Sequence, residues 1–243
     1  MDQSSLGVAH FLAETDGVVR ILLLVLVVMS TATWYLIAAK VFKHWRMRGY
    51  GRAFLKRFWE ASDLDQVNKS LCEFGVHDPF SHLTHHGLRA AEQFRNRTGN
   101  GLIESGSADE FFTRALRRAI EQDTSRLEYG LTVLASVASS APFIGLFGTV
   151  WGIYHALINI GVSGVGTLDQ VAGPVGEALI MTALGLAVAI PAVLAYNGFS
   201  RANRLTLAEI DGFAHDLFAF MATGIRTDNR VPAAGDAPLL RSA

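Results

Sequence analysis

Three polar residues in or beside the apolar stretches of the chain are candidates for function: Thr149, Glu177 and Thr182. A carboxyl group within a membrane can bind and release protons, and it is costly there unless it is neutral, paired or hydrated. Glu177 is therefore a candidate for a proton pathway. A structural role is equally open at this stage, because a carboxylate in the first turn of a helix that starts at Pro174 complements the helix dipole.

The two threonines also have an ordinary explanation, because a hydroxyl in an apolar helix usually bonds to a carbonyl of its own helix. Glu177 and Thr182 are five residues apart, which is about 140° around an ideal helix. They would share a face only where the helix is locally distorted.

Small residues recur at spacings of three and four in the same apolar stretches. Such stripes let helix backbones approach each other in lipid, where no hydrophobic force drives helices together. In the third apolar stretch such a stripe consists of Ala178, Thr182, Gly185 and Ala189. We expect a helix-packing role above all for Gly145, Gly148, Gly152 and Gly185.

Three apolar stretches are long enough to carry these residues across a bilayer, which takes about 20 residues of helix. The first has no Asp, Glu, Lys, Arg or His from Ile21 to Ala39, and the second has no Asp, Glu, Lys or Arg from Tyr129 to Leu168. The third runs from Ala178 to Ser200. The acidic start of the chain does not resemble a cleavable signal, so the first stretch is expected to be a retained span.

Basic residues follow the first and third stretches, from Lys40 to Arg57 and at Arg201 and Arg204. Because basic flanks stay in the cytoplasm, we expect a periplasmic N-terminus and a cytoplasmic C-terminus in the bacterial inner membrane. The predicted segments are a periplasmic N-terminus (1–17), spans at 18–39, 129–160 and 173–200, a cytoplasmic helical region (40–128), a periplasmic loop (161–172), a cytoplasmic helix (201–225) and a disordered tail (226–243).

The second and third spans are expected to extend beyond the bilayer. Ser107 and Glu110 form a capping box, and we predict one unbroken helix from about Asp109 through the second span. The third helix is predicted to start near Pro174, or earlier if Thr167 caps it. The predicted fold is an all-α membrane protein with three transmembrane helices, two of them extended into a cytoplasmic helical bundle, assembled as an oligomeric ring.

Other kinds of chemistry have little support in the sequence. No nucleophile, acid and base are spaced for catalysis, so an enzyme is not expected, and no motif indicates a cofactor or nucleic acid. Cys72 is the single cysteine. Packing or solvation explains the histidines better than a metal site, and none is assigned; they are His77, His82, His85 and His86.

A long run resembles the second-span signature of the ExbB/TolQ/MotA family of proton-driven stators: Ala141-Pro-Phe-Ile-Gly-Leu-Phe-Gly-Thr-Val-Trp-Gly-Ile153. The stretch from Val171 to Thr182, followed by Ala189-Ile-Pro-Ala-Val193, is similar to the family's third span. Gly173-Pro174 stands where Pro-Gly is common in relatives. The resemblance implies that Glu177 is the family's essential acid and that Thr149 and Thr182 line the same lumen.

The resemblance further implies a homo-oligomer, pentameric in this family, around an ExbD- or TolR-like single-pass partner whose membrane aspartate carries the proton. Proton flow would then drive a TonB-like protein and outer-membrane uptake. Long cytoplasmic helices and a short periplasmic loop favour the ExbB or TolQ type over MotA, with ExbB preferred. The alternatives are a TolQ-like stator of the Tol-Pal envelope system, a non-conducting membrane scaffold and a stand-alone channel.

Overall fold

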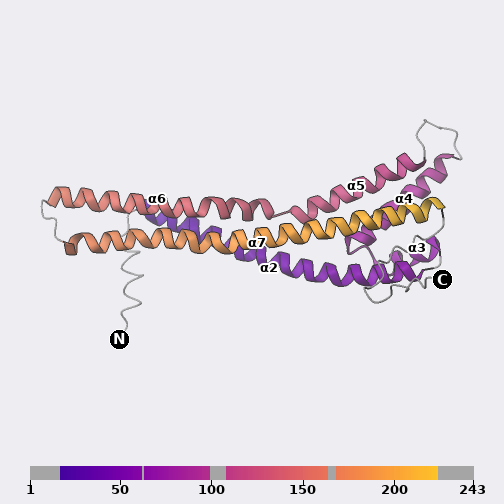
Figure 1. The fold of residues 1–243 in the computed structure, drawn as a ribbon, viewed down its shortest axis with the longest axis horizontal. Coiled ribbons are helices and arrows are strands. Elements are labelled where there is room, and N and C mark those ends of the chain that lie inside the picture. Colours follow the sequence, from indigo (N-terminus) through magenta and orange to yellow (C-terminus); the bar gives the residue numbers. More distant parts are fainter. Residues whose placement is uncertain (1–16, 62, 99–107, 164–167, 224–243) are drawn as a thin grey trace, which may run out of the picture. The chain divides into compact units, whose positions relative to one another are not determined.

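The computed structural model describes residues 17–61, 63–98, 108–163 and 168–223 of the 243-residue chain. These residues form helices and no strand, which confirms the predicted all-α fold for this part of the chain. The predicted tail at 226–243 lies outside the described residues, as do residues 1–16 and Ser107. The helices are α2 (Gly17–Glu60), α3 (Leu64–Phe74), α4 (Pro79–Thr98), α5 (Ala108–Glu128), α6 (Leu131–Ser163) and α7 (Leu168–Thr223) (Figure 1).

Within the described residues, three helical stretches are long and apolar enough to cross a membrane. They lie in Gly17–Glu60, in Asp109–Ile158, which spans α5 and α6, and in Gly173–Met221 of α7. Their number agrees with the three predicted spans. Helix α7 begins at Leu168, close to the earlier of its two predicted starts. Helix α2 continues without interruption past Lys40 to Glu60, whereas a helix of this length was predicted only for the second and third spans.

The prediction of one unbroken helix from Asp109 through the second span is wrong. Helix α5 ends at Glu128 and α6 starts at Leu131. Between them Gly130 has a φ angle of +80°, a left-handed conformation that ends a helix and that glycine adopts without steric cost. The sequence contains this signal at Gly130, but no helix breaker was predicted between Asp109 and the second span.

Side chains from two other helices satisfy the carbonyl groups at this break. The Lys40 ammonium of α2 donates a hydrogen bond to the Leu127 carbonyl oxygen at 2.9 Å, and the Asn203 amide of α7 donates to the same oxygen at 2.8 Å. Lys43 donates to the Arg126 carbonyl oxygen at 3.4 Å. The last carbonyls of a helix have no partner within it, so these contacts stabilise the end of α5.

The described chain divides into two compact units, of which one comprises residues up to 46 together with 125–205. In this unit α6 and α7 lie side by side, and α2 packs against them (Figure 1). Its buried cluster, which we call the α2–α6–α7 cluster, joins apolar residues of all three helices: Val19, Leu26, Val137, Ala141, Met181, Val188, Ala189 and Ala192, with Trp151 packed at its edge.

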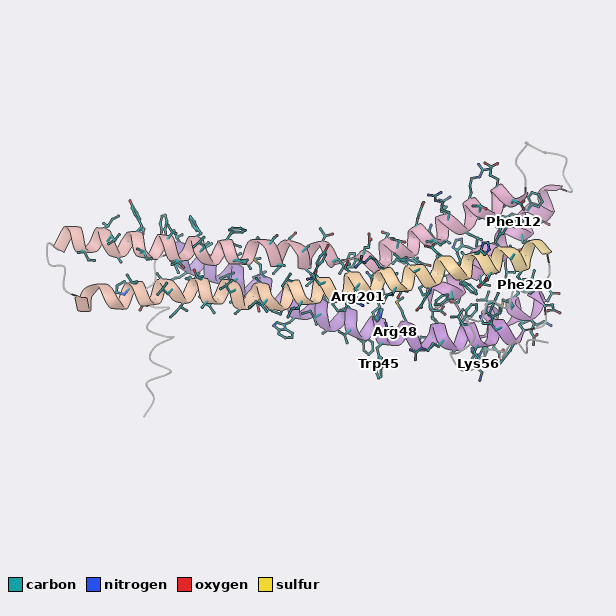
Figure 2. The ribbon with its side chains drawn as sticks, in the orientation of Figure 1. Trp45, Arg48, Lys56, Phe112, Arg201 and Phe220 are labelled. Atoms are coloured by element: carbon teal, nitrogen blue, oxygen red, sulfur yellow. The ribbon has the colours of Figure 1, made fainter. Side chains whose placement is uncertain are left out.

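Many large apolar side chains of this unit are exposed, as expected of helices that face lipid or other chains. Trp45 lies near the end of the part of α2 that belongs to this unit. Its side chain is 79% exposed and points away from the helix (Figure 2). Phe143 of α6 is 70% exposed and Leu194 of α7 is 66% exposed.

The second unit comprises residues 47–124 and 206 onward. Its core is rich in phenylalanine: Phe58 contacts Phe213 with ring centroids 4.9 Å apart and Phe220 at 6.1 Å, both edge to face. Helix α3 starts at the N-cap Asp63, whose carboxylate accepts the Gln66 N–H at 2.9 Å. Helix α7 contributes Ile210, Phe213, Leu217 and Phe220 to this core.

Candidate functional site

The structure brings two of the three predicted polar residues together. The hydroxyl groups of Thr149 on α6 and Thr182 on α7 are in hydrogen-bonding contact. The Thr149 hydroxyl also lies 3.2 Å from the Gly145 carbonyl oxygen of its own helix and 3.1 Å from the Ala178 carbonyl oxygen of α7. Thr149 is 7% exposed. Its hydroxyl thus links the two helices as well as bonding within its own.

Glu177 does not join this pair. Its side chain is half-buried, and it has no hydrogen-bonding or ionic partner within the part of the chain that the structure describes. Glu177 and Thr182 are five residues apart on α7 and therefore point to different sides of the helix, as helical geometry predicts. A first-turn cap is no longer the simplest explanation of Glu177, because α7 starts at Leu168 and Glu177 lies more than two turns inside it.

Glycines set how closely α6 and α7 approach each other. A β-carbon on Gly145 would lie 2.6 Å from the Met181 carbonyl oxygen, and one on Gly185 would lie 2.7 Å from the Ala141 carbonyl oxygen. A β-carbon on Gly148 would meet the Met181 side chain at 3.0 Å, and one on Gly152 would meet the Ala178 β-carbon at 2.9 Å. The structure therefore places all four predicted packing glycines along the α6–α7 contact.

The sequence analysis missed an ionisable residue in this region, His155 of α6. Its Nδ1 lies 3.1 Å from the Trp151 carbonyl oxygen, and its ring lies 4.7 Å from that of Trp151 and 5.4 Å from that of Tyr154. The signal was present, because a histidine interrupts an apolar stretch. The predicted spans were defined by the absence of Asp, Glu, Lys and Arg alone, so this histidine was not among the candidate residues.

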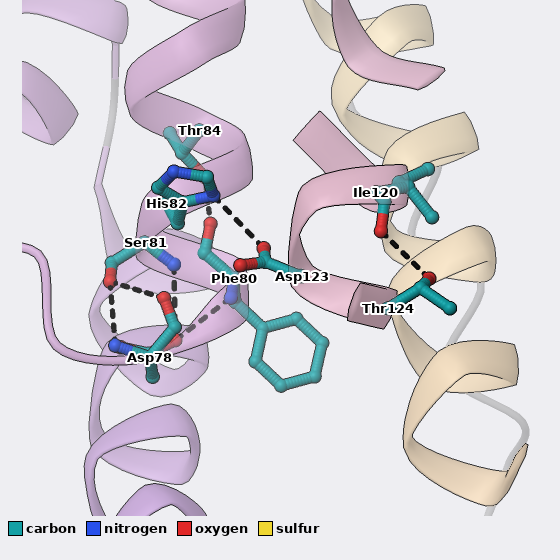
Figure 3. Close-up of polar contacts among 8 residues, drawn as sticks. All are labelled: Asp78, Phe80, Ser81, His82, Thr84, Ile120, Asp123 and Thr124. Atoms are coloured by element: carbon teal, nitrogen blue, oxygen red, sulfur yellow. Dashed lines mark hydrogen bonds and ion pairs between the residues drawn. The ribbon is translucent and has the colours of Figure 1, made fainter. Parts of the chain in front are cut away.

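Histidines of the second unit meet a buried carboxylate. Nδ1 of His82 on α4 lies 2.9 Å from the Asp123 carboxylate of α5, and both side chains are largely buried (Figure 3). Asp78 accepts the Phe80 and Ser81 backbone N–H groups at the start of α4. Burial, followed by the charges of Arg89 and His82, lowers the pKa of His85.

The neighbouring His86 is affected in the same way. Burial, with His82, His85, Arg89 and Arg118 nearby, lowers its pKa. Its ring contacts the ring of His82, with centroids 4.5 Å apart. Among the described residues, no group of three or more histidine, cysteine or acidic side chains is arranged to hold a metal ion.

Comparison with known proteins gives one consistent result. The sequence model of the MotA/TolQ/ExbB proton channel family matches residues 77–211. The chain is 42% identical to the biopolymer transport protein ExbB of Xanthomonas campestris pv. campestris (strain B100) over 231 residues, 92% of this chain and 91% of the relative. It is 42% identical to ExbB of Neisseria gonorrhoeae over 83% of this chain and 91% of the relative. Identity to the Tol-Pal system protein TolQ of Pseudomonas aeruginosa is 33% over 90% of this chain and 94% of the relative.

Proposed function

The chain belongs to the MotA/TolQ/ExbB proton channel family, and we propose that it is the ExbB-like subunit of a motor complex driven by proton flow across the bacterial inner membrane. The ExbB type is favoured over the TolQ type because two ExbB relatives reach 42% identity and the TolQ relative reaches 33%. TolQ function in the Tol-Pal system is the second candidate, since that identity extends over 222 residues.

The observation that carries the proposal is a half-buried carboxyl group in an apolar helix, next to a close helix contact. Glu177 directly precedes Ala178, whose carbonyl oxygen lies within hydrogen-bonding distance of the Thr149 hydroxyl. A carboxyl group within a membrane marks an ion or proton pathway more often than a structural position. In this proposal Glu177 exchanges protons, and Thr149 and Thr182 line the path.

The working complex in this proposal contains more than one chain. We infer a homo-oligomeric ring, a pentamer by resemblance to the family, around an ExbD-like single-pass protein whose membrane carboxylate takes up the proton. A TonB-like protein would then transmit the work to outer-membrane transport. Exposed apolar side chains on α6 and α7, such as Phe143 and Leu194, support burial against lipid and neighbouring copies.

Orientation follows from the basic residues. Lys40, Lys43 and Arg46 lie beyond the apolar part of α2, and Arg201 and Arg204 follow the apolar part of α7. Under the positive-inside rule both ends belong to the cytoplasm. The N-terminus and the α6–α7 connection would then be periplasmic.

The test is Glu177→Gln, which keeps the shape of the side chain and removes its ability to exchange a proton. We expect the variant to assemble as the wild type does, by native mass spectrometry, and to abolish growth that depends on TonB-driven iron uptake. Glu209→Gln, on the exposed part of the same helix, is the matched control and should grow normally. Wild-type growth of an assembled Glu177→Gln variant would remove Glu177 from the pathway.

A further inference from the structure

His155 is an ionisable side chain in an apolar helix that the proposed function does not use. A carbonyl oxygen can only accept a hydrogen bond, so the 3.1 Å contact with the Trp151 carbonyl places a proton on Nδ1. In the neutral ring, Nε2 then carries the lone pair. The Trp151 ring lies against the imidazole, with centroids 4.7 Å apart, so the ring is held in one orientation.

The contacts between α6 and α7 place His155 and Glu177 at nearly the same depth. A β-carbon on Gly152 would lie 2.9 Å from the Ala178 β-carbon, so these residues are level in the antiparallel pair. Glu177 comes one residue before Ala178, and His155 comes three residues after Gly152. Both therefore lie beyond this contact toward the α6–α7 connection, at heights that differ by about 3 Å at 1.5 Å per residue.

His155 and Glu177 also lie on the same flank of the α6–α7 contact. Residues four apart share a helix face, which groups Trp151 with His155 on α6 and Glu177 with Met181 on α7. Met181 and Trp151 both pack in the α2–α6–α7 cluster. Each of the two ionisable residues is thus one helical turn above a member of that cluster.

A third observation points to a polar ligand on this flank. The indole Nε1 of Trp151 is buried and has no hydrogen-bond acceptor among the described residues. Buried donors are almost always paired with a protein group or an ordered water. A donor left open one turn from an imidazole, on the flank that carries a carboxyl group, fits a water or a carboxylate oxygen.

We propose that His155 is a second proton-transfer residue, which passes protons to Glu177; this rests on the proposed role of Glu177. In the step, the Nε2–H bond of the His155 imidazolium breaks and an O–H bond forms on the Glu177 carboxylate. The ring returns to its neutral form with Nδ1–H still bonded to the Trp151 carbonyl, and takes the next proton from water. The Glu177 carboxylic acid then releases its proton toward the partner chain.

The experiment measures proton flux into liposomes that hold the complex purified with its co-encoded partner. His155→Gln keeps a polar side chain but cannot carry a proton, and we expect a loss of about a hundredfold or more, typical of removing a positioned acid–base group. His215→Gln, the same substitution at an exposed position of α7, is the matched control and should conduct like the wild type. An assembled His155→Gln complex with wild-type flux would overturn the proposal.

A second variant separates proton transfer from packing. In His155→Ala, added imidazole should restore flux in proportion to its concentration, which a purely structural role would not produce. Absence of rescue in assembled rings, or loss of assembly in every His155 variant, would assign the residue a structural role. Glu177→Gln in the same liposomes distinguishes the two proposals: if it blocks flux while His155→Gln does not, only the role of His155 fails.

Discussion

Gly145 and Gly185 lie back to back, so that a β-carbon on either would be 3.0 Å from the Cα atom of the other. The helices therefore meet backbone to backbone at this point, and no rotation of a side chain can make room. Lipid supplies no hydrophobic force that favours helix association, so close packing of this kind is a main source of stability in the membrane.

Gly145→Ala should destabilise the α6–α7 pair by about 1–3 kcal/mol or more, the usual cost of overpacking. Its β-carbon would lie 2.6 Å from a backbone oxygen, which cannot move without moving the helix. Gly198→Ala on α7 is the control, because nothing lies within 4 Å of its β-carbon position. Thermal unfolding in detergent compares the two, and equal midpoints would contradict the close contact.

Gly130→Ala should also destabilise the chain, by about 1–2 kcal/mol, because a side chain is disfavoured at its φ angle of +80°. Gly130→Asn should lose less, since asparagine tolerates the left-handed region best among residues with a side chain. Unfolding midpoints of the three proteins give the order. If alanine matches glycine, the break between α5 and α6 does not depend on this conformation.

The two donors on the Leu127 carbonyl should act together. Asn203→Ala removes a neutral hydrogen bond, worth about 0.5–1.5 kcal/mol, and Lys40→Met removes one from a charged group, worth about 1.5–3 kcal/mol. The double variant leaves the carbonyl without either side-chain donor, so its loss should exceed the sum. Arg204→Ala, exposed on the same helix as Asn203, is the control. Strict additivity would show that the two bonds are independent.

Acid should weaken the second unit through its histidines. The pKa values of His85 and His86 are lowered in the folded chain, chiefly by burial, from a value of about 6.5 when unfolded. At pH values between the folded and unfolded pKa the unfolded chain binds more protons than the folded chain. The free energy of unfolding is therefore highest above about pH 6.5 and declines below it. Unfolding midpoints at pH 7.5 and 5.5 should show this decline.

A double variant, His85→Gln with His86→Gln, should show a smaller decline between the two pH values. His215→Gln, exposed on α7, serves as the control and should keep the wild-type decline. A decline of the same size in all three proteins would place the acid sensitivity elsewhere in the unit.

The sequence predicted best what depends on pattern. Length and apolar content identified three helices able to span a membrane. The spacing of small residues predicted close helix packing at four glycines, without naming the helix that each would meet. Helical geometry also predicted that Glu177 and Thr182 would point in different directions. Each of these features is determined by residues within one segment of the chain, so a single sequence is enough to predict it.

The features that were missed depend on segments far apart in the chain. Lys40 was interpreted only as a positive charge near the membrane, yet in the fold it bonds to a carbonyl 87 residues away. Asn203 was not considered at all, because an asparagine amide gives no sign in sequence of which carbonyl it will meet. The position of His155 at the depth of Glu177 depends on the contact between Gly152 of α6 and Ala178 of α7, which a single sequence does not show.

The Leu127 carbonyl also has a consequence for the order in which the chain is made. The ribosome produces Lys40 before Leu127, so the lysine bond can form as soon as the first two apolar helices meet. Asn203 follows Leu127 by 76 residues, and its bond must wait until the last apolar helix has been synthesised and inserted. A nascent chain that stalls before Asn203 therefore holds this junction with one donor, and only the final insertion event completes it.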